Sequence, residues 1–135
     1  MNLGHTGPTR EIDGPVGRLE ALLDNPRAEL PLDSESTPRA VVVFAHPHPQ
    51  QGGTMHSKIV YRGAKAFSAM GCAVLRFNFR GVGRSAGTFD EGQGELADYL
   101  AALDYAEKQY PGLPLYAAGY SFGAWIAMNA GATDP

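Results

Sequence analysis

The chain has 135 residues, of which 44% are hydrophobic and 19% charged, which is enough for one compact domain with an apolar core. Its net charge of −3 argues against nucleic acid or a membrane as the main partner, because such surfaces require clustered Lys and Arg. No long uninterrupted apolar stretch or signal peptide is apparent, and the single cysteine, Cys72, has no partner for an internal disulfide. These features favour a cytoplasmic protein.

The first part of the chain predicts short strands between loops. Residues 1–9 are rich in Gly, Pro and polar side chains, so we expect a flexible tail, followed by one partial domain over residues 10–135. Strand-like segments lie around Glu11–Ile12 and Arg18–Leu23, separated by a turn. Residues 24–39 hold three prolines and several acids, which predicts a loop.

From residue 40 onward strands and helices alternate. A continuous apolar run predicts a strand buried on both faces over residues 40–45, and further strands are predicted over residues 72–79 and 115–119. Apolar side chains at helical spacing predict helices over residues 59–70 and 96–110, and a third from about Ala124. This order predicts an α/β fold, a mostly parallel sheet of about five strands with three flanking helices. The loops after the parallel strands then share one rim, where ligands of such sheets bind.

One of these loops matches a nucleophile motif. The sequence Gly119-Tyr120-Ser121-Phe122-Gly123 fits G-x-S-x-G and lies between a predicted strand and a predicted helix. Small residues two before and two after the serine permit the tight turn that lifts its hydroxyl above the sheet. The five letters alone are a weak signal, but the strand and helix around them make Ser121 a candidate nucleophile.

The loop after the first apolar strand is the candidate partner of this serine. Acyl transfer needs two N–H donors for the developing oxyanion, and the backbone N–H of Phe122 is one. The second is expected in the loop His46-Pro47-His48-Pro49-Gln50-Gln51-Gly52-Gly53, where the prolines leave His48, Gln50 and Gln51 as donors. We select His48, and expect the His46 side chain to hold the turn by bonding loop backbone. Two histidines could instead bind a metal, but no further ligand cluster supports this, so no metal is expected.

A glycine-rich loop follows the second apolar strand. Gly81-Val82-Gly83-Arg84-Ser85-Ala86 fits the dinucleotide pattern G-x-G-x-x-A, which also requires a helix to open at once. Residues 87–94 do not allow that helix, so we expect a tight loop beside the serine turn. Arg80 or Arg84 is expected to pair with a carboxylate; direct binding of an acidic substrate is the alternative.

Together these segments resemble the α/β-hydrolase superfamily. The Arg80-Gly81-Val82-Gly83-Arg84-Ser85 loop, the His-Pro loop and the serine motif resemble a compact bacterial group of hydrolases similar to dienelactone hydrolases and acyl-peptidase domains. The resemblance implies cofactor-free hydrolysis of an ester, thioester or amide in a small acyl substrate. It also implies Ser121 as nucleophile, an oxyanion hole from Phe122 and His48, and a strand 115–119 beside the first parallel strand.

The sequence departs from this family after the serine. The superfamily order is Ser, then acid, then His, but only fourteen residues follow Ser121, with no His and a single acid, Asp134. We therefore expect the N-terminal portion of an α/β-hydrolase fold, with the acid and base beyond Pro135, and no catalytic role for Asp134. A non-catalytic hydrolase-like interaction module is the alternative.

Overall fold

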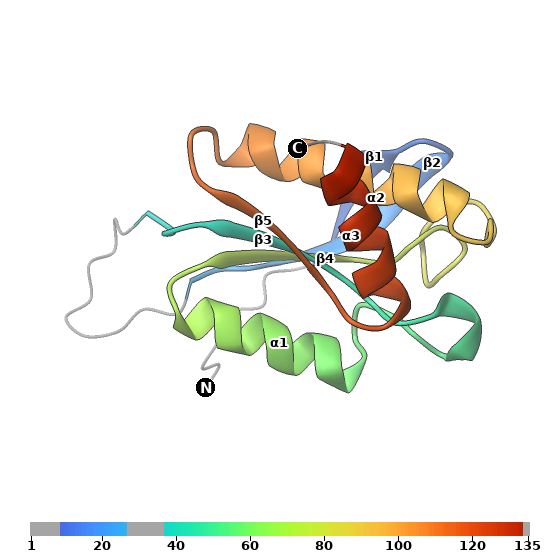
Figure 1. The fold of residues 1–135 in the computed structure, drawn as a ribbon, viewed down its shortest axis with the longest axis horizontal. Coiled ribbons are helices and arrows are strands. Elements are labelled where there is room, and N and C mark those ends of the chain that lie inside the picture. The colour runs from blue at the N-terminus through green and yellow to red at the C-terminus, as the bar shows by residue number, and fades with distance from the viewer. Residues whose placement is uncertain (1–8, 27–36, 134–135) are drawn as a thin grey trace.

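The computed structural model describes residues 9–26 and 37–133. Most of the expected tail, much of the expected loop and Asp134 lie outside these ranges. The described residues form a five-stranded sheet in the order β1-β2-β4-β3-β5, with helices on both faces (Figure 1). The predicted α/β class is confirmed, and so is the expected number of strands and helices.

The sheet begins with an antiparallel hairpin. Strands β1 (Arg10–Gly14) and β2 (Gly17–Asp24) pair in a register that places Ile12 opposite Leu19. Both side chains are buried. Strand β2 then pairs antiparallel with β4 (Ala73–Phe77), so the hairpin extends the parallel part of the sheet at one side. Both strands predicted in this region are present.

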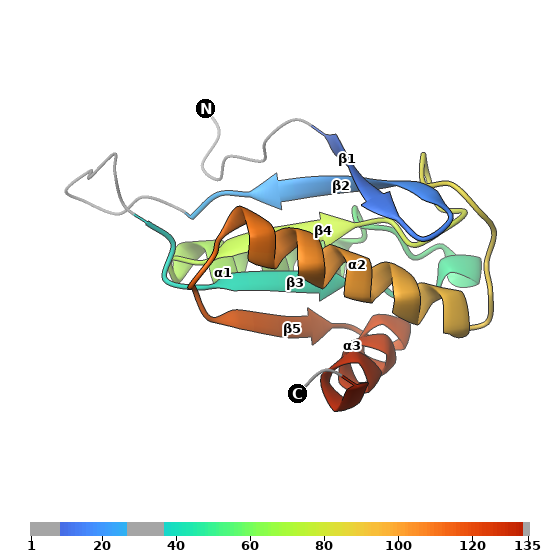
Figure 2. The same cartoon turned by 90° about the horizontal axis from the view of Figure 1, so that it is seen from above.

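The parallel strands place the candidate loops at one rim. Strand β3 (Val41–Ala45) lies between β4 and β5 (Leu115–Gly119) and runs parallel to both. Every residue of β3 and β4 is buried, which explains the apolar run of β3; in β4 the buried Arg76 pairs with Asp24 at 2.7 Å. The arrows of β3, β4 and β5 point to the same end of the molecule, where the loops after these three strands meet (Figure 2). The expected position of β5 beside β3 is confirmed.

Three helices cover the sheet. Helix α1 (Lys58–Ala69) packs on one face, and α2 (Gln93–Gln109) and α3 (Phe122–Thr133) lie on the other (Figure 1). The larger apolar cluster fills the space between the sheet and α2 and α3, and a smaller one lies under α1. None of the described helices is long and apolar enough to cross a membrane.

The helix starts differ from the sequence prediction. Helix α2 begins at Gln93, ahead of its first periodic leucine, because the Glu95 carboxylate accepts the N–H groups of Asp90 and Gly92 at 2.8 Å each. Helix α3 begins at Phe122, directly after the serine, rather than at Ala124. A short 3-10 turn, η1 (Pro49–Gln51), was not predicted.

The other edge of the sheet is apolar and open. Within the described part of the chain, β5 pairs with β3 alone, and its residues are exposed or only partly buried. Large hydrophobic side chains on β5, the turn after it and α3 are also exposed, namely Tyr116, Tyr120, Trp125 and Met128. This edge is the aggregation liability that an unpaired strand presents.

Candidate active site

Ser121 occupies a strained turn between β5 and α3. Its φ of 57° lies in the left-handed region, which is uncommon for a residue with a side chain. The turn is closed by the Gly123 N–H, which donates to the Tyr120 carbonyl at 2.9 Å. Ser121 is exposed at the rim, and α3 begins with the next residue. The N–H of Phe122, the first residue of that helix, therefore lies beside the serine.

The two glycines of the motif are required by close backbone contacts. A Cβ atom on Gly119 would lie 2.5 Å from the carbonyl carbon and oxygen of Gly123. A Cβ atom on Gly123 would lie 2.3 Å from the Ala45 carbonyl oxygen at the end of β3. Any side chain at either position would push the serine turn away from the sheet. The sequence pattern G-x-S-x-G thus has a steric cause at both ends.

The His-Pro loop offers one uncommitted backbone donor. The Gln50 N–H donates to His48 Nδ1 at 3.1 Å, and the Gln51 N–H donates to the His48 carbonyl at 3.0 Å. Of the three donors that the sequence left open, only the His48 N–H has no acceptor among the described residues. The Phe122 N–H likewise has none there.

Ring contacts hold His48 and Phe122, the residues of these two donors, next to each other. The His48 and Phe122 rings lie with centroids 4.9 Å apart, so the His-Pro loop packs against the serine turn. The Phe89 ring joins them, 5.2 Å from His48 and 6.1 Å from Phe122. The sequence alone does not point to Phe89, because no motif covers the segment before α2. The contacts of Phe89 with His48 and Phe122 depend on how that segment folds against the rim.

His46 is a buried structural side chain. It is fully buried, with Nδ1 2.7 Å from the Pro47 carbonyl and Nε2 accepting the Phe79 N–H at 3.2 Å. This arrangement requires the proton on Nδ1 and joins the loops after β3 and β4. Burial lowers the pKa of His46 to about 4, although its bond to Pro47 acts in the opposite direction. His46 is therefore neutral at pH 7, and both ring nitrogens are already engaged.

Arg80 serves the scaffold beside the glycine-rich loop. Its guanidinium forms an ion pair with the buried Asp98 of α2 at 2.9 Å, and the Arg80 N–H also donates to Asp98 at 3.0 Å. The hydrogen bond from the guanidinium to the Asp98 carboxylate is the main cause that raises the pKa of Arg80. The guanidinium also passes so close to Gly94 that a Cβ there would lie 2.2 Å from Nη1. Of the two expectations for Arg80, pairing with a carboxylate is the one observed.

The glycine-rich loop is a tight turn without a helix after it. Gly81 and Gly83 have φ values of 77° and 55°, and a Cβ on Gly83 would lie 2.6 Å from the amide nitrogen of Asn78. That amide donates to Glu20 at 2.9 Å and accepts the Met55 N–H at 2.8 Å. The loop is thus tied to β2 and to the segment before α1. Helix α2 starts only at Gln93, so the geometry of a dinucleotide site is absent from this loop.

A catalytic base for Ser121 is not evident in the described residues. His46 is engaged on both nitrogens, and His56 is exposed in the turn before α1. His48 packs its ring on Phe122 and accepts the Gln50 N–H with Nδ1. In the same part of the chain no three His, Cys, Asp or Glu side chains come together as metal ligands. Among the described residues the candidate site therefore comprises the exposed Ser121 and the N–H groups of His48 and Phe122, which have no acceptor there.

Comparison with known proteins identifies the family. The family model described as serine aminopeptidase, S33, matches residues 36–135. The chain belongs to this family. Its fold is that of the α/β-hydrolases, as the sequence resemblance implied.

Solved structures and curated relatives agree with this assignment. An α/β serine hydrolase homologue from Coxiella burnetii superposes with a TM-score of 0.86 at 37% identity, covering 96% of this chain and 59% of that one. An uncharacterized protein of Rickettsia prowazekii is 43% identical over 90% of this chain and 48% of its own length. A monoacylglycerol lipase of Mycolicibacterium smegmatis is 31% identical over 75% of this chain and 35% of its own. The chain thus spans about half or less of the curated relatives that it matches.

Proposed function

We propose that the protein is a serine hydrolase that cleaves an ester, thioester or amide through an acyl-enzyme, with Ser121 as nucleophile. The observation that carries the proposal is the left-handed backbone of Ser121, between two glycines that tolerate no Cβ. A fold has no reason to retain a strained serine at a sheet rim, whereas a nucleophile needs that exposure.

In this mechanism the Ser121 hydroxyl attacks the acyl carbonyl and the oxyanion receives two hydrogen bonds. The N–H groups of Phe122 and His48 are the donors, since neither has another acceptor in the described chain. Donors of this kind stabilise the tetrahedral intermediate more than the ground state. No cofactor enters the reaction, and the substrate is a small acyl compound whose apolar part meets the rings of Phe89 and Phe122.

The base and its orienting acid are assigned to sequence that this chain does not span. A serine hydroxyl needs an imidazole to take its proton, and an Asp or Glu to orient that imidazole. His46 is unsuited because it is buried and engaged on both nitrogens. The relatives are about twice as long as the matched region, which leaves room for both residues. With one cysteine and no internal disulfide, we place the protein in the cytoplasm.

The test is labelling by a serine-reactive fluorophosphonate. In protein expressed from the complete reading frame, we expect one phosphonylated residue, Ser121, identified by peptide mass spectrometry. Ser121→Ala should remove the label, and Tyr120→Phe, beside it in the same turn, should keep it. An unlabelled, folded protein would instead support the alternative, a hydrolase-like module that binds a partner without catalysis.

A further inference from the structure

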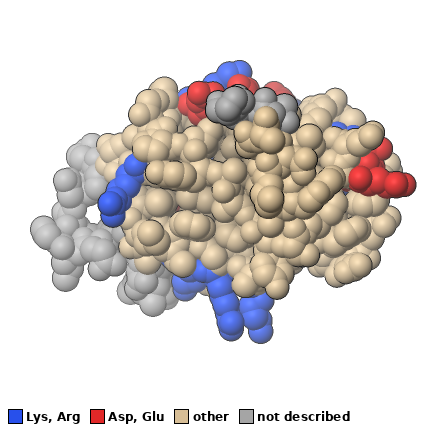
Figure 3. Space-filling view, in the orientation of Figure 1, with Lys and Arg blue, Asp and Glu red and all other residues tan. Residues whose placement is uncertain are grey.

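The charges of this molecule are segregated across the sheet. Helix α1 carries Lys58, Arg62 and Lys65 and no acid, whereas α2 carries four acids and one base. The two helices lie on opposite faces (Figure 1). In the space-filling view the lower margin, under α1, shows blue side chains without red ones (Figure 3). The molecule therefore has a basic face, the outer face of α1, although its net charge is −3.

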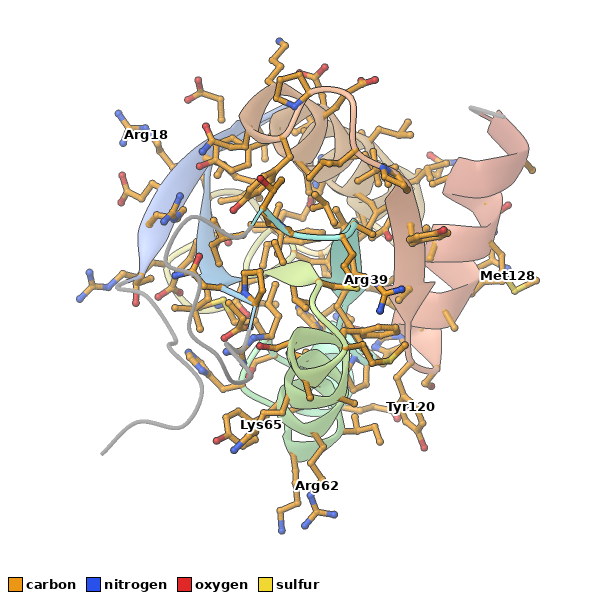
Figure 4. All side chains as sticks on the ribbon, turned by 90° about the vertical axis from the view of Figure 1, so that its left-hand side faces the viewer. Arg18, Arg39, Arg62, Lys65, Tyr120 and Met128 are labelled. Carbon is orange, nitrogen blue, oxygen red and sulfur yellow. The ribbon has the colours of Figure 1, made fainter. Side chains whose placement is uncertain are left out.

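The three bases of α1 are free to meet a partner. All are exposed, and none forms an ion pair with another described residue. Arg62 and Lys65 point away from the sheet (Figure 4). Elsewhere, exposed bases are partly neutralised, as where Lys108 pairs with Asp104 at 2.9 Å.

Helix stability does not explain this charge placement. Lys58 is the first residue of α1, the first turn has no acid, and the last turn has no base. The N-terminus of a helix carries a partial positive charge, so a lysine there is electrostatically unfavourable. The preceding Ser57 makes no side-chain capping bond to the helix. The bases are thus retained against the local preference of the helix.

Apolar side chains lie among these bases. Ile59 and Tyr61 are 42% and 44% exposed, and the Lys65 ammonium lies 5.3 Å from the centroid of the Tyr61 ring. Bases interspersed with aliphatic and aromatic side chains match the surface of an anionic bilayer. There the negatively charged headgroups attract the bases, and the adjoining acyl region accepts the apolar side chains. Three bases are few for a nucleic-acid groove, which also has no use for an exposed isoleucine.

We propose that the outer face of α1 binds an anionic lipid surface. The loop that carries His48 continues through η1 and residues 52–57 into the N-terminus of α1, so a membrane on this face lies beside the rim of the sheet. This contact is independent of the catalytic proposal, because it needs neither Ser121 nor a base. It replaces the expectation, drawn from net charge, that membranes are not a partner.

Co-sedimentation with vesicles tests this surface. The full chain is expected to bind phosphatidylcholine vesicles that contain phosphatidylserine, to bind pure phosphatidylcholine weakly, and to lose binding as salt rises. The triple variant Lys58→Gln, Arg62→Gln, Lys65→Gln should lose about 100-fold in affinity, from about 1 kcal/mol per base. A Tyr61→Ser variant should bind less tightly with an unchanged salt dependence.

A charge-matched control separates the surface from net charge. The variant Arg18→Gln, Arg84→Gln, Lys108→Gln removes three exposed bases elsewhere and should keep most of the binding. Circular dichroism establishes that both triple variants fold, which is expected because all six side chains are exposed. Equal losses in the two variants, equal binding to neutral vesicles, or binding to duplex DNA without binding to vesicles would each overturn the proposal.

Discussion

At the scale of single residues, backbone geometry decides which groups can take part in chemistry. Motif matching proposed several donors in the His-Pro loop, and hydrogen-bond accounting reduces them to the His48 N–H. The sequence already selected His48, but it could not show that the N–H groups of Gln50 and Gln51 are engaged, because their bonds depend on the turn η1. The proposed oxyanion hole can be tested by two variants of His48 that both lose the hydrogen bond from the Gln50 N–H to the imidazole and differ in the backbone N–H.

His48→Pro removes the proposed donor. The φ of His48 is −52°, which the proline ring accommodates, and the lost N–H has no acceptor among the described residues. If this N–H stabilises the oxyanion, kcat of the complete protein should fall about 100-fold or more. His48→Ala keeps the N–H and serves as control for the imidazole. Equal activities of the two variants would remove His48 from the oxyanion hole.

The buried His46 predicts a pH-dependent stability. Its pKa is lowered from 6.5 to about 4 in the folded protein, so between these values the unfolded chain binds the proton that the folded chain excludes. The stabilising effect is complete above pH 6.5 and is lost as the pH falls toward 4, by up to about 3 kcal/mol. Urea unfolding from pH 7 to 4 measures it, with exposed His56→Gln as control.

Nuclear magnetic resonance provides a direct check on this titration. The imidazole signals of His46 should titrate with a midpoint near 4, whereas an ordinary midpoint near 6.5 would contradict the burial argument.

At the scale of elements, the rim is built by close packing of three loops on parallel strands. The turn after β5 rests on the end of β3, His46 joins the loops after β3 and β4, and Arg80 anchors the glycine-rich loop to α2. The sequence predicted these loops at one rim because parallel strands end together. It could not predict that Asp98 is the partner of Arg80, since that contact depends on how α2 crosses the sheet.

Two glycines of α3 should respond in opposite ways to alanine. Gly123→Ala places a Cβ 2.3 Å from the Ala45 carbonyl oxygen and should lower the free energy of unfolding by about 2 kcal/mol or more. Gly131→Ala meets nothing within 4 Å and should raise it by about 0.5 kcal/mol through helix propensity. Thermal unfolding of both variants measures the difference. A neutral Gly123→Ala would show that α3 can move away from β3.

At the scale of the whole molecule, the described residues hold the candidate nucleophile without an evident base to activate it. The described chain holds the serine turn and a scaffold, and its histidines are engaged, exposed or stacked on Phe122. The open edge of β5 is the side on which further strands of an α/β-hydrolase sheet would pair. Activity is therefore expected to depend on sequence beyond the matched region.

Residues 1–135 by themselves should hydrolyse p-nitrophenyl acetate no faster than their own Ser121→Ala variant. Loss of a triad member typically lowers the rate by several orders of magnitude, which brings turnover near the background of the assay. Steady-state hydrolysis at matched protein concentration is the measurement. Robust turnover that depends on Ser121 would mean that a residue of this chain serves as the base.

The sequence by itself determined the α/β class, the number of strands and helices, and the serine turn. These follow from local patterns: apolar runs for buried strands, helical spacing, and glycines where a turn requires them. Helix starts were less well predicted, since the early start of α2 depends on Glu95 reaching back to Asp90 and Gly92.

Only the tertiary structure decided which groups are free. It identified the partners of His46 and Arg80 and showed that two of the three loop donors are already hydrogen-bonded. It also placed Phe89 against His48 and Phe122 and separated the bases of α1 from the acids of α2. The reason is physical: hydrogen bonds and surface charge depend on distances between segments far apart in the chain. Composition and motif spacing do not contain those distances.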